Sequence, residues 1–518
     1  MTSSGTRSNT IALVAVCLAS LMFGLEISSV PAILPTLEQV LHADFKDMQW
    51  VMNAYTIACT TVLMATGTLA DRFGRRRVFL ICTIAFGITS LLCGVAPNVS
   101  TLIVGRFLQG MAGGAMFICT LAVLSHQFQA GVERSNAFVA WGVISGIGLG
   151  FGPVIGGLIV AAANWRWVFM IQLPLVALSL FLAVGGVQES KDPHAEKLDV
   201  GGIASLSAAV FALTWYITQG ADLGFASMTA LGVLAISITA FVAFVWIETR
   251  SAHPMFDFSV FGIRAFSGAI IGCIGMNFSY WPLMIYLPIY FRGVLGYDST
   301  TTGFFLLAYT LPFLAMTPLA ERLLQRHQAR IAVPLGLFTI GAGLLLMKLG
   351  SGLEHASGWT MLPGILLAGV GIGLTNTPVT NTTTASVSSD RAGMASGIDV
   401  SARLIALAIN IAVMGLLLQQ RIASYLEGVT GDALGATRRR SLAEEIATGN
   451  LDASDAIARA ALAHGFDGLL LYGGVGVCML AAASFSIFGA AKRETLAASS
   501  AMAAASDVNC PNTASETH

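Results

Sequence analysis

The stretch Gly67-Thr-Leu-Ala-Asp-Arg-Phe-Gly-Arg-Arg-Arg77 decides how this chain folds. It carries four arginines and one aspartate, and it lies between two apolar runs, 50–69 and 78–95. Each run is about the length needed to cross a bilayer. Short basic turns between such runs stay on the cytoplasmic side of a membrane. The stretch therefore predicts two membrane-spanning helices joined by a cytoplasmic turn.

The same turn is a candidate gating element. Asp71 is expected among arginines near helix ends, where a carboxylate accepts charged hydrogen bonds or faces a helix N-terminus. A glycine at 67 lets the second helix approach a neighbour closely. Such a latch can be made and broken as two bundles move, whereas the simpler alternative is an orientation signal alone. The candidate latch residues are Gly67, Asp71, Arg72, Gly74, Arg75 and Arg76.

The composition belongs to an integral membrane protein. The 518 residues have a mean hydropathy of +0.76, and 11% are charged, whereas about 25% is usual in soluble domains. A net charge of -1 leaves no basic face for nucleic acid. The eight cysteines have no metal-site spacing, and the chain has no phosphate-binding loop or cofactor motif. We therefore expect no enzymatic activity, no cofactor and no bound metal.

Apolar runs of spanning length repeat along the whole chain. Because the backbone must satisfy its own hydrogen bonds in lipid, each run is expected to be a helix. Lysine and arginine are concentrated in the connections on one side, which places both termini in the cytoplasm. Fourteen runs are present: 11–34, 50–69, 78–95, 102–124, 138–161, 167–184, 201–219, 230–247, 267–290, 303–319, 331–349, 361–379, 398–418 and 468–490.

A weak internal repeat divides the chain into two halves. Pro318-Leu-Ala-Glu-Arg-Leu323 repeats the Leu-Ala-Asp-Arg pattern of 69–72, as expected for two parallel-related six-helix halves. We predict an N-terminal bundle (1–186), a linker with two inserted helices (187–250) and a C-terminal bundle (251–496). Segment 421–466 is predicted to form short amphipathic helices on the outer surface, more consistent with a lid than with a binding domain. Residues 497–518 are predicted to be a disordered cytoplasmic tail.

Two ionisable residues lie inside spans of the N-terminal half. Charged groups in a bilayer are costly and are functional candidates. Glu26 lies about 12 Å, and Arg106 about 6 Å, from the outer ends of their helices at 1.5 Å per residue, so the arginine is expected to reach the glutamate. Burial raises and a guanidinium lowers a carboxyl pKa, so a partner that comes and goes would couple proton binding to movement. The alternative is a static ion pair.

A second charged pair, Asp399 and Arg403, lies near the inner end of the thirteenth run. The two residues are four apart and therefore share one face of a helix. They either stabilise that helix end as an i,i+4 pair or take part in proton coupling or in binding a cationic substrate.

The fifth run contains Gly148-Leu-Gly-Phe-Gly-Pro-Val-Ile-Gly-Gly157. Glycines 148, 152 and 156 make one bare face for close helix contact, and Pro153 is expected to bend the helix. Packing alone could account for such a run. The order Gly-Pro-x-x-Gly-Gly, which ends with Gly156 and Gly157, is more restrictive.

The ninth run is rich in aromatic residues and contains two prolines. Interrupted helices line cavities in transporters, and aromatic faces suit flat or cationic compounds. Asn376 in the twelfth run is a further candidate, with a helix-to-helix hydrogen bond as the alternative. Tyr290 is expected in the interfacial aromatic belt. The predicted substrate-cavity residues are Asn277, Tyr280, Trp281, Tyr286 and Asn376.

These motifs together resemble the fourteen-span drug/proton antiporters of the major facilitator superfamily. Residues 67–76 match the superfamily's signature loop, and the Gly-Pro-x-x-Gly-Gly order resembles the antiporter signature of exporters. Similar motifs occur at 25–35, 106–114, 165–174 and 253–257. The chain departs from the usual pattern at Glu26 (usually Asp), Pro31 (usually Asn), Gln172 (usually Asn), Asp399 and Asn410.

The resemblance implies a major facilitator fold and proton-driven export of small amphipathic compounds by alternating access. In such a protein Glu26 would carry the proton and Arg106 would modulate it. We expect a monomer in a bacterial inner membrane, with lipid, proton and substrate as partners and room for a periplasmic adaptor. The alternatives are uptake or facilitated flux of a metabolite, and a non-transporting membrane sensor.

Overall fold

The fold is described from a computed structural model of residues 1–518. It describes residues 3–508 apart from 129–130, 191–198, 252–256, 354, 388–391, 432–434 and 450–455. Some side chains within helices, Asp71 among them, also lie outside the described set. Within the described residues the secondary structure is entirely helical.

The helices follow one another with short connections. Those of the first half are α1 (Ser3–Leu41), α2 (Phe45–Phe73), α3 (Arg75–Gly94), α4 (Val99–Gln127), α5 (Gly131–Ala162), α6 (Arg166–Met170) and α7 (Gln172–Gly186). Then come α8 (Val200–Leu223) and α9 (Met228–Arg250). The second half contains η1 (Phe258–Gly262), α10 (Arg264–Gly293), α11 (Ser299–His327), α12 (Ala329–Ser351), α13 (Gly358–Ala385), α14 (Ala392–Thr430), α15 (Ala436–Ala447) and α16 (Ala456–Val508).

Polar residues in the connections fix where several helices begin. The Asp44 side chain accepts a hydrogen bond from the Asp47 amide (2.7 Å), and the Asp47 side chain accepts one from the Asp44 amide (3.3 Å), which forms a capping box at α2. Asn98 caps α4 through the Thr101 amide (2.9 Å). Gly74 separates α2 from α3 with φ 110°, a conformation that favours glycine.

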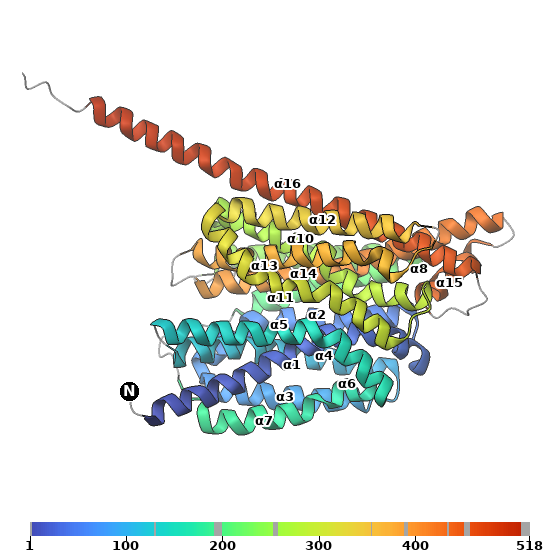
Figure 1. Ribbon diagram of the computed structural model, residues 1–518, viewed down its shortest axis with the longest axis horizontal. Coiled ribbons are helices and arrows are strands. Elements are labelled where there is room, and N and C mark those ends of the chain that lie inside the picture. Colours follow the sequence, from blue (N-terminus) through green and yellow to red (C-terminus); the bar gives the residue numbers. More distant parts are fainter. Residues whose placement is uncertain are drawn as a thin grey trace, which may run out of the picture.

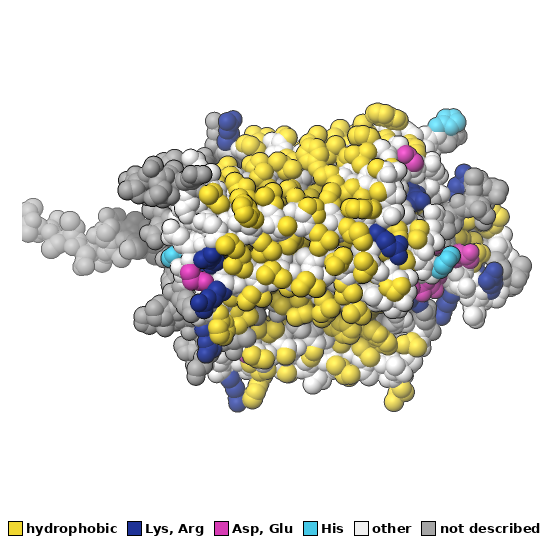
Figure 2. Space-filling model, turned by 90° about the horizontal axis from the view of Figure 1, so that it is seen from below, with side chains coloured by type: hydrophobic (Ala, Val, Ile, Leu, Met, Phe, Trp, Pro, Cys, Tyr) yellow, Lys and Arg dark blue, Asp and Glu magenta, His cyan; other side chains and the backbone are white. Residues whose placement is uncertain are grey.

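Thirteen of the helical stretches in the described part of the chain are long and apolar enough to cross a membrane. The expected second span, 50–69, lies within α2, which is 29 residues long but is not among these thirteen. Figure 2 shows a broad apolar band over the outside, with charged side chains mostly toward its two ends. This surface fits a bilayer, and the protein is therefore a multi-pass membrane protein.

The helices form two bundles. In Figure 1, α1 and α3–α7 lie in the lower half and α10–α14 and α16 in the upper half. The inserted α8 and α9 pair with each other, and α8 lies against α2 and α14. We call the end that carries the α1–α2 connection the Asp44 end, and the end that carries the α2–α3 turn the Gly74 end. The N-terminus lies at the Gly74 end (Figure 1).

Several boundaries differ from the sequence expectations. Within segment 421–466, α14 continues to Thr430 and α16 begins at Ala456, so α15 is the one separate short helix among the residues of this segment that the structure describes. The α16 backbone is helical to Val508, where a disordered tail was expected from 497, and residues 509–518 lie outside the described residues. Residues 191–198 of the linker and residues 253–256 of motif 253–257 also lie outside them. The prediction that Tyr290 lies in the interfacial aromatic belt is wrong, because its ring is buried against Phe466 (centroids 4.7 Å apart).

Candidate functional site: buried ion pairs in two helical bundles

An ion pair lies fully buried in the first bundle. Arg106 Nη1 on α4 is 2.5 Å from Glu26 Oε1 on α1, and neither side chain is exposed to solvent. The two residues are 80 positions apart in the chain, and the fold brings them together as their similar depths predicted. Whether this pair couples transport to protons remains a prediction.

Amide groups surround this pair on both sides. Gln172 at the start of α7 donates from Nε2 to Glu26 Oε2 (3.0 Å). Gln109 Oε1 accepts from Arg106 Nη1 (2.8 Å), and Gln109 Nε2 donates to Ser90 Oγ (2.9 Å). Each charged group therefore has a neutral partner besides the opposite charge. Sequence reasoning identified Gln172 only as a departure from a family pattern and assigned no role to Gln109.

The arginine is held by α2 as well. Its Nε donates to the Val51 carbonyl (3.1 Å), and its Cζ lies 4.2 Å from the centre of the Tyr55 ring, a cation–π contact. Arg106 Nη2 and the Tyr55 hydroxyl have no hydrogen-bond partner among the described residues. Since a buried pair is seldom more stable than an apolar replacement, its presence in a membrane bundle points to function.

The second charged pair lies in the other bundle, near the Gly74 end. Arg403 and Asp399 are joined within α14 (Nη2 to Oδ2, 3.0 Å), and their side chains are 16% and 3% exposed. Arg403 also donates to Asn376 Oδ1 (2.6 Å) and Thr380 Oγ1 (3.0 Å) on α13. The pair is thus more than a local helix contact, because it ties α14 to α13.

The predicted substrate-cavity residues have separate partners. Tyr280 stacks on Tyr309 (centroids 4.1 Å apart), and each hydroxyl donates to the other residue's carbonyl. Asn277 donates to the Cys273 carbonyl of its own helix (2.9 Å). Trp281 lies edge-on to Tyr280, Tyr286 donates to the Ile411 carbonyl of α14, and Asn376 binds Arg403. Their assignment to a substrate cavity stays a prediction.

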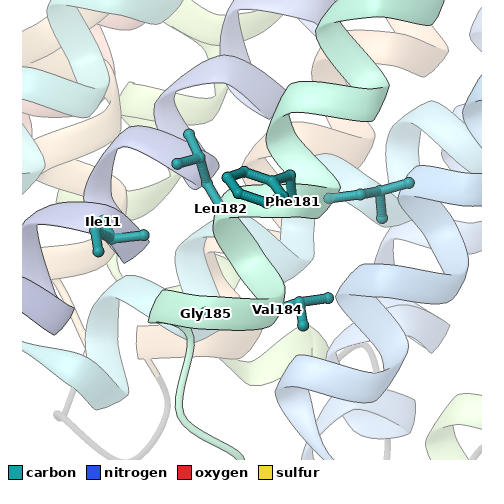
Figure 3. Close-up of a pocket in the computed structure, with 6 residues that line it drawn as sticks. Ile11, Phe181, Leu182, Val184 and Gly185 are labelled. Atoms are coloured by element: carbon teal, nitrogen blue, oxygen red, sulfur yellow. The ribbon is translucent and has the colours of Figure 1, made fainter.

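A cavity of about 500 Å³ lies elsewhere, between α1 and α7. Figure 3 shows Ile11 of α1 opposite Phe181, Leu182 and Val184 of α7. All six lining residues are apolar or glycine, and none is a predicted site residue. Such a groove suits lipid chains and offers no polar group that could select a substrate.

The glycine run of α5 lies at two helix contacts. A Cβ at 148 would come within 2.7 Å of the Leu21 carbonyl oxygen and one at 156 within 2.9 Å of the Ser29 carbonyl oxygen, both on α1. On the other side, a Cβ at Gly157 would come within 2.6 Å of the Ser299 carbonyl oxygen on α11. Gly152 meets Ser28 of α1, while Pro153 lies against Gly303 of α11. The run thus packs one helix from each bundle against α5.

The Gly74 turn is held by a residue that the sequence reasoning missed. Glu189, which follows α7, accepts a hydrogen bond from the Arg76 amide (3.2 Å) and forms an ion pair with Arg77 (3.6 Å). A carboxylate thus lies at the N-terminus of α3, as expected for a helix dipole, but the expected carboxylate was Asp71. The Asp71 side chain and position 67 lie outside the described set. Arg72 is exposed, Arg75 and Arg76 are half-buried, and the Arg75 amide donates to the Ser190 carbonyl (3.0 Å).

Polar contacts between the two bundles gather toward the Asp44 end. Gln49 Nε2 of α2 donates to the Tyr286 hydroxyl (3.0 Å) and the Ile411 carbonyl (3.3 Å). Arg292 of α10 donates to Thr36 of α1 (2.9 Å). Lys46 of α2 lies 3.5 Å from Glu444 of α15. The bundles are therefore joined at the Asp44 end, where the α15 segment covers them.

Two helical bundles, one with a fully buried ion pair and the other with a partly exposed one, define a membrane transporter of the two-bundle class. The Major Facilitator Superfamily model matches residues 16–410. The chain belongs to this superfamily, which confirms the resemblance found in its motifs.

Relatives and solved structures agree with this assignment. The chain is 32% identical to the multidrug resistance protein Stp of Mycobacterium tuberculosis, over 81% of this chain and 78% of that protein. It is 30% identical to the tetracenomycin C resistance and export protein of Streptomyces glaucescens, over 79% and 76%. The crystal structure of the human organic anion transporter MFSD10 superposes with a TM-score of 0.58 at 14% identity, over 94% of this chain and 100% of that one. This structural likeness confirms the fold.

Proposed function

We propose that this protein exports small amphipathic organic compounds, such as antibiotics, in exchange for protons by alternating access. Its relatives include proteins named for multidrug resistance and for tetracenomycin C resistance and export. The proton gradient would supply the energy, without a cofactor or covalent chemistry. The basic Gly74 turn supports a cytoplasmic position for that end and for both termini. The membrane would then be a bacterial inner membrane, with the protein acting as a monomer.

The buried pair of Glu26 and Arg106 carries the proton part of this proposal. In the structure the Glu26 carboxyl is paired with Arg106 and shielded from solvent. Protonation would cancel its charge and remove the main electrostatic attraction to Arg106. Since Arg106 also holds α2 through Val51, a change at Glu26 would reach the helix that carries Gln49 and Lys46. Proton binding would thereby loosen the contacts that close the Asp44 end.

The direct test replaces the carboxyl with an amide of the same shape. In proteoliposomes with an imposed pH gradient, Glu26→Gln is expected to abolish proton-driven movement of puromycin and of a quinolone while insertion and folding remain intact. The matched control is Glu38→Gln, the same chemical change on the same helix. Unchanged export by Glu26→Gln would remove the proton role. Proton-driven movement of these compounds toward the cytoplasmic side of the protein would instead support uptake.

A further inference from the structure

A glutamine lies beside the carboxyl of Glu26 with one end of its amide unused. Gln172 is the first residue of α7, directly after the break from α6 at Ile171, and it is almost fully buried. Its Nε2 donates to Glu26 Oε2 at 3.0 Å. Its Oε1 is buried and has no hydrogen-bond partner in the described part of the chain. An unpaired buried carbonyl oxygen is costly and needs an explanation.

The contrast with Gln109 shows what the unused oxygen permits. Both ends of the Gln109 amide are engaged, with Arg106 Nη1 on the oxygen and Ser90 on the nitrogen. Turning that amide over would place its N–H groups against those of Arg106 and break the hydrogen bond to Nη1, even though the Ser90 hydroxyl could donate to the turned oxygen. The Gln172 amide has one hydrogen bond only, so a half-turn about its last side-chain bond exchanges donor and acceptor without breaking a second contact.

We propose that Gln172 is a positioning residue for proton coupling that serves both protonation states of Glu26. With the carboxylate charged, the amide N–H donates to Oε2. When a proton from water binds Oε2, the carboxylic acid becomes a donor, and the amide turns so that its Oε1 accepts the O–H. One hydrogen bond replaces another, and no covalent bond other than the new O–H forms. This inference rests on the proposed proton exchange.

The surroundings of Glu26 direct the proton to this oxygen. Its Oε1 is occupied by Arg106 Nη1, which leaves Oε2, the oxygen that faces Gln172, to bind the proton. The other titratable groups near the pair are the Tyr55 hydroxyl and Cys59 on α2 and Cys93 on α3. These groups are neutral at ordinary pH. Gln172 is therefore the neighbour whose amide can exchange donor for acceptor when Oε2 of Glu26 gains or loses a proton.

Infrared difference spectroscopy of the full-length protein in lipid tests this role. The carbonyl band of protonated Glu26 is assigned by its loss in Glu26→Gln. In Gln172→Met this band should move to higher wavenumber, because the acid has lost its acceptor, and proton-driven puromycin export should fall about tenfold, as for one lost hydrogen bond to a charged group. Gln172→Asn keeps an amide and should restore most of both signals. Ser179→Ala removes another buried hydrogen bond of α7 and should leave the band unchanged.

A second measurement covers the case in which Gln172→Met does not fold. With isotope-labelled glutamine, the amide carbonyl band of Gln172 is assigned by its loss in Gln172→Asn. In the wild-type protein this band should shift when Glu26 is protonated. The proposal would be overturned if the carbonyl band of protonated Glu26 kept its position in Gln172→Met. It would also be overturned if the labelled Gln172 amide band did not shift when Glu26 is protonated. Loss of the proton role of Glu26 itself appears separately, as unchanged export by Glu26→Gln.

Discussion

The two ion pairs within the helical bundles are built differently. Glu26 and Arg106 come from two helices, α1 and α4, and both are fully buried. Asp399 and Arg403 come from one helix, and the Arg403 side chain keeps 16% of its surface exposed. The first pair is a product of tertiary structure, whereas spacing along α14 alone brings the second together. The first should therefore be sensitive to every movement between helices and the second much less so.

Their positions add to this difference. Glu26 and Arg106 lie toward the Asp44 end, which Gln49, Arg292 and Lys46 close by contacts between the bundles. Arg403 lies toward the Gly74 end, about three turns after Ala392, where α14 begins. A protein closed at one end shields the pair nearer to that end. Alternating access predicts that opening the Asp44 end exposes the first pair while the second changes little.

The largest expected effect breaks the first pair. Arg106→Met leaves the buried Glu26 carboxyl with the Gln172 amide but without its opposite charge, which should destabilise the protein by about 3–5 kcal/mol. It also removes the contact to the Val51 carbonyl. Thermal unfolding in detergent, followed by size-exclusion chromatography, measures the loss. The double variant Glu26→Gln/Arg106→Met should recover much of this stability but no proton-driven export, because no titrating group remains. A single variant as stable as the wild type would show that Glu26 is not charged in the folded state.

A smaller effect should come from a wedge at the Asp44 end. A Cβ added at Gly415 of α14 would overlap Gln49 Nε2 and lie 2.9 Å from the Tyr286 hydroxyl. The Gln49 amide would have to leave, and its two hydrogen bonds between the bundles with it. Gly415→Ala should therefore shift the equilibrium toward opening of the Asp44 end by about tenfold, as for one or two lost hydrogen bonds.

Spin labels at the exposed residues Gln39 and Leu353, one on each bundle at the Asp44 end, report this shift as a longer distance between the two labels. Hydrogen exchange should rise around Arg106 and stay unchanged around Arg403. Gly428→Ala is the matched control, since it lies on the same helix with open space around it. In a Gln49→Ala background, Gly415→Ala should have little further effect. Equal opening by Gly428→Ala would mean that helix propensity, and not the contact with Gln49, sets the equilibrium.

The sequence predicted the scaffold well because hydropathy and helix length follow directly from composition along the chain. It also predicted that Glu26 and Arg106 meet, since depth in a span can be counted. It did not predict Gln172 or Gln109 as their partners, because helix rotation decides which amide faces which charge. For the same reason it did not predict that Asn376, a candidate for the substrate cavity, accepts a hydrogen bond from Arg403.

Connections were harder to predict than spans. Glu189 belongs to a polar segment whose composition is typical of a linker. It reaches the start of α3 because α7 ends at the Gly74 end. Likewise, the sequence reasoning did not place the end of α14, although Gly431, with φ 57°, directly follows Thr430 in the position where a glycine ends many helices.

The smallest expected effect concerns the second pair. Asp399→Asn removes the negative charge from beside Arg403 but keeps the shape of the side chain. Arg403 retains Asn376 and Thr380 as acceptors, and its exposed surface lets water solvate the remaining charge. We therefore expect a loss of about 1 kcal/mol, near the value for a partly exposed pair. The same thermal unfolding assay as for Arg106→Met makes the two pairs comparable. A loss as large as that of Arg106→Met would mean that Arg403 is as poorly hydrated as Arg106, and the difference between the two pairs would then be one of helix origin alone.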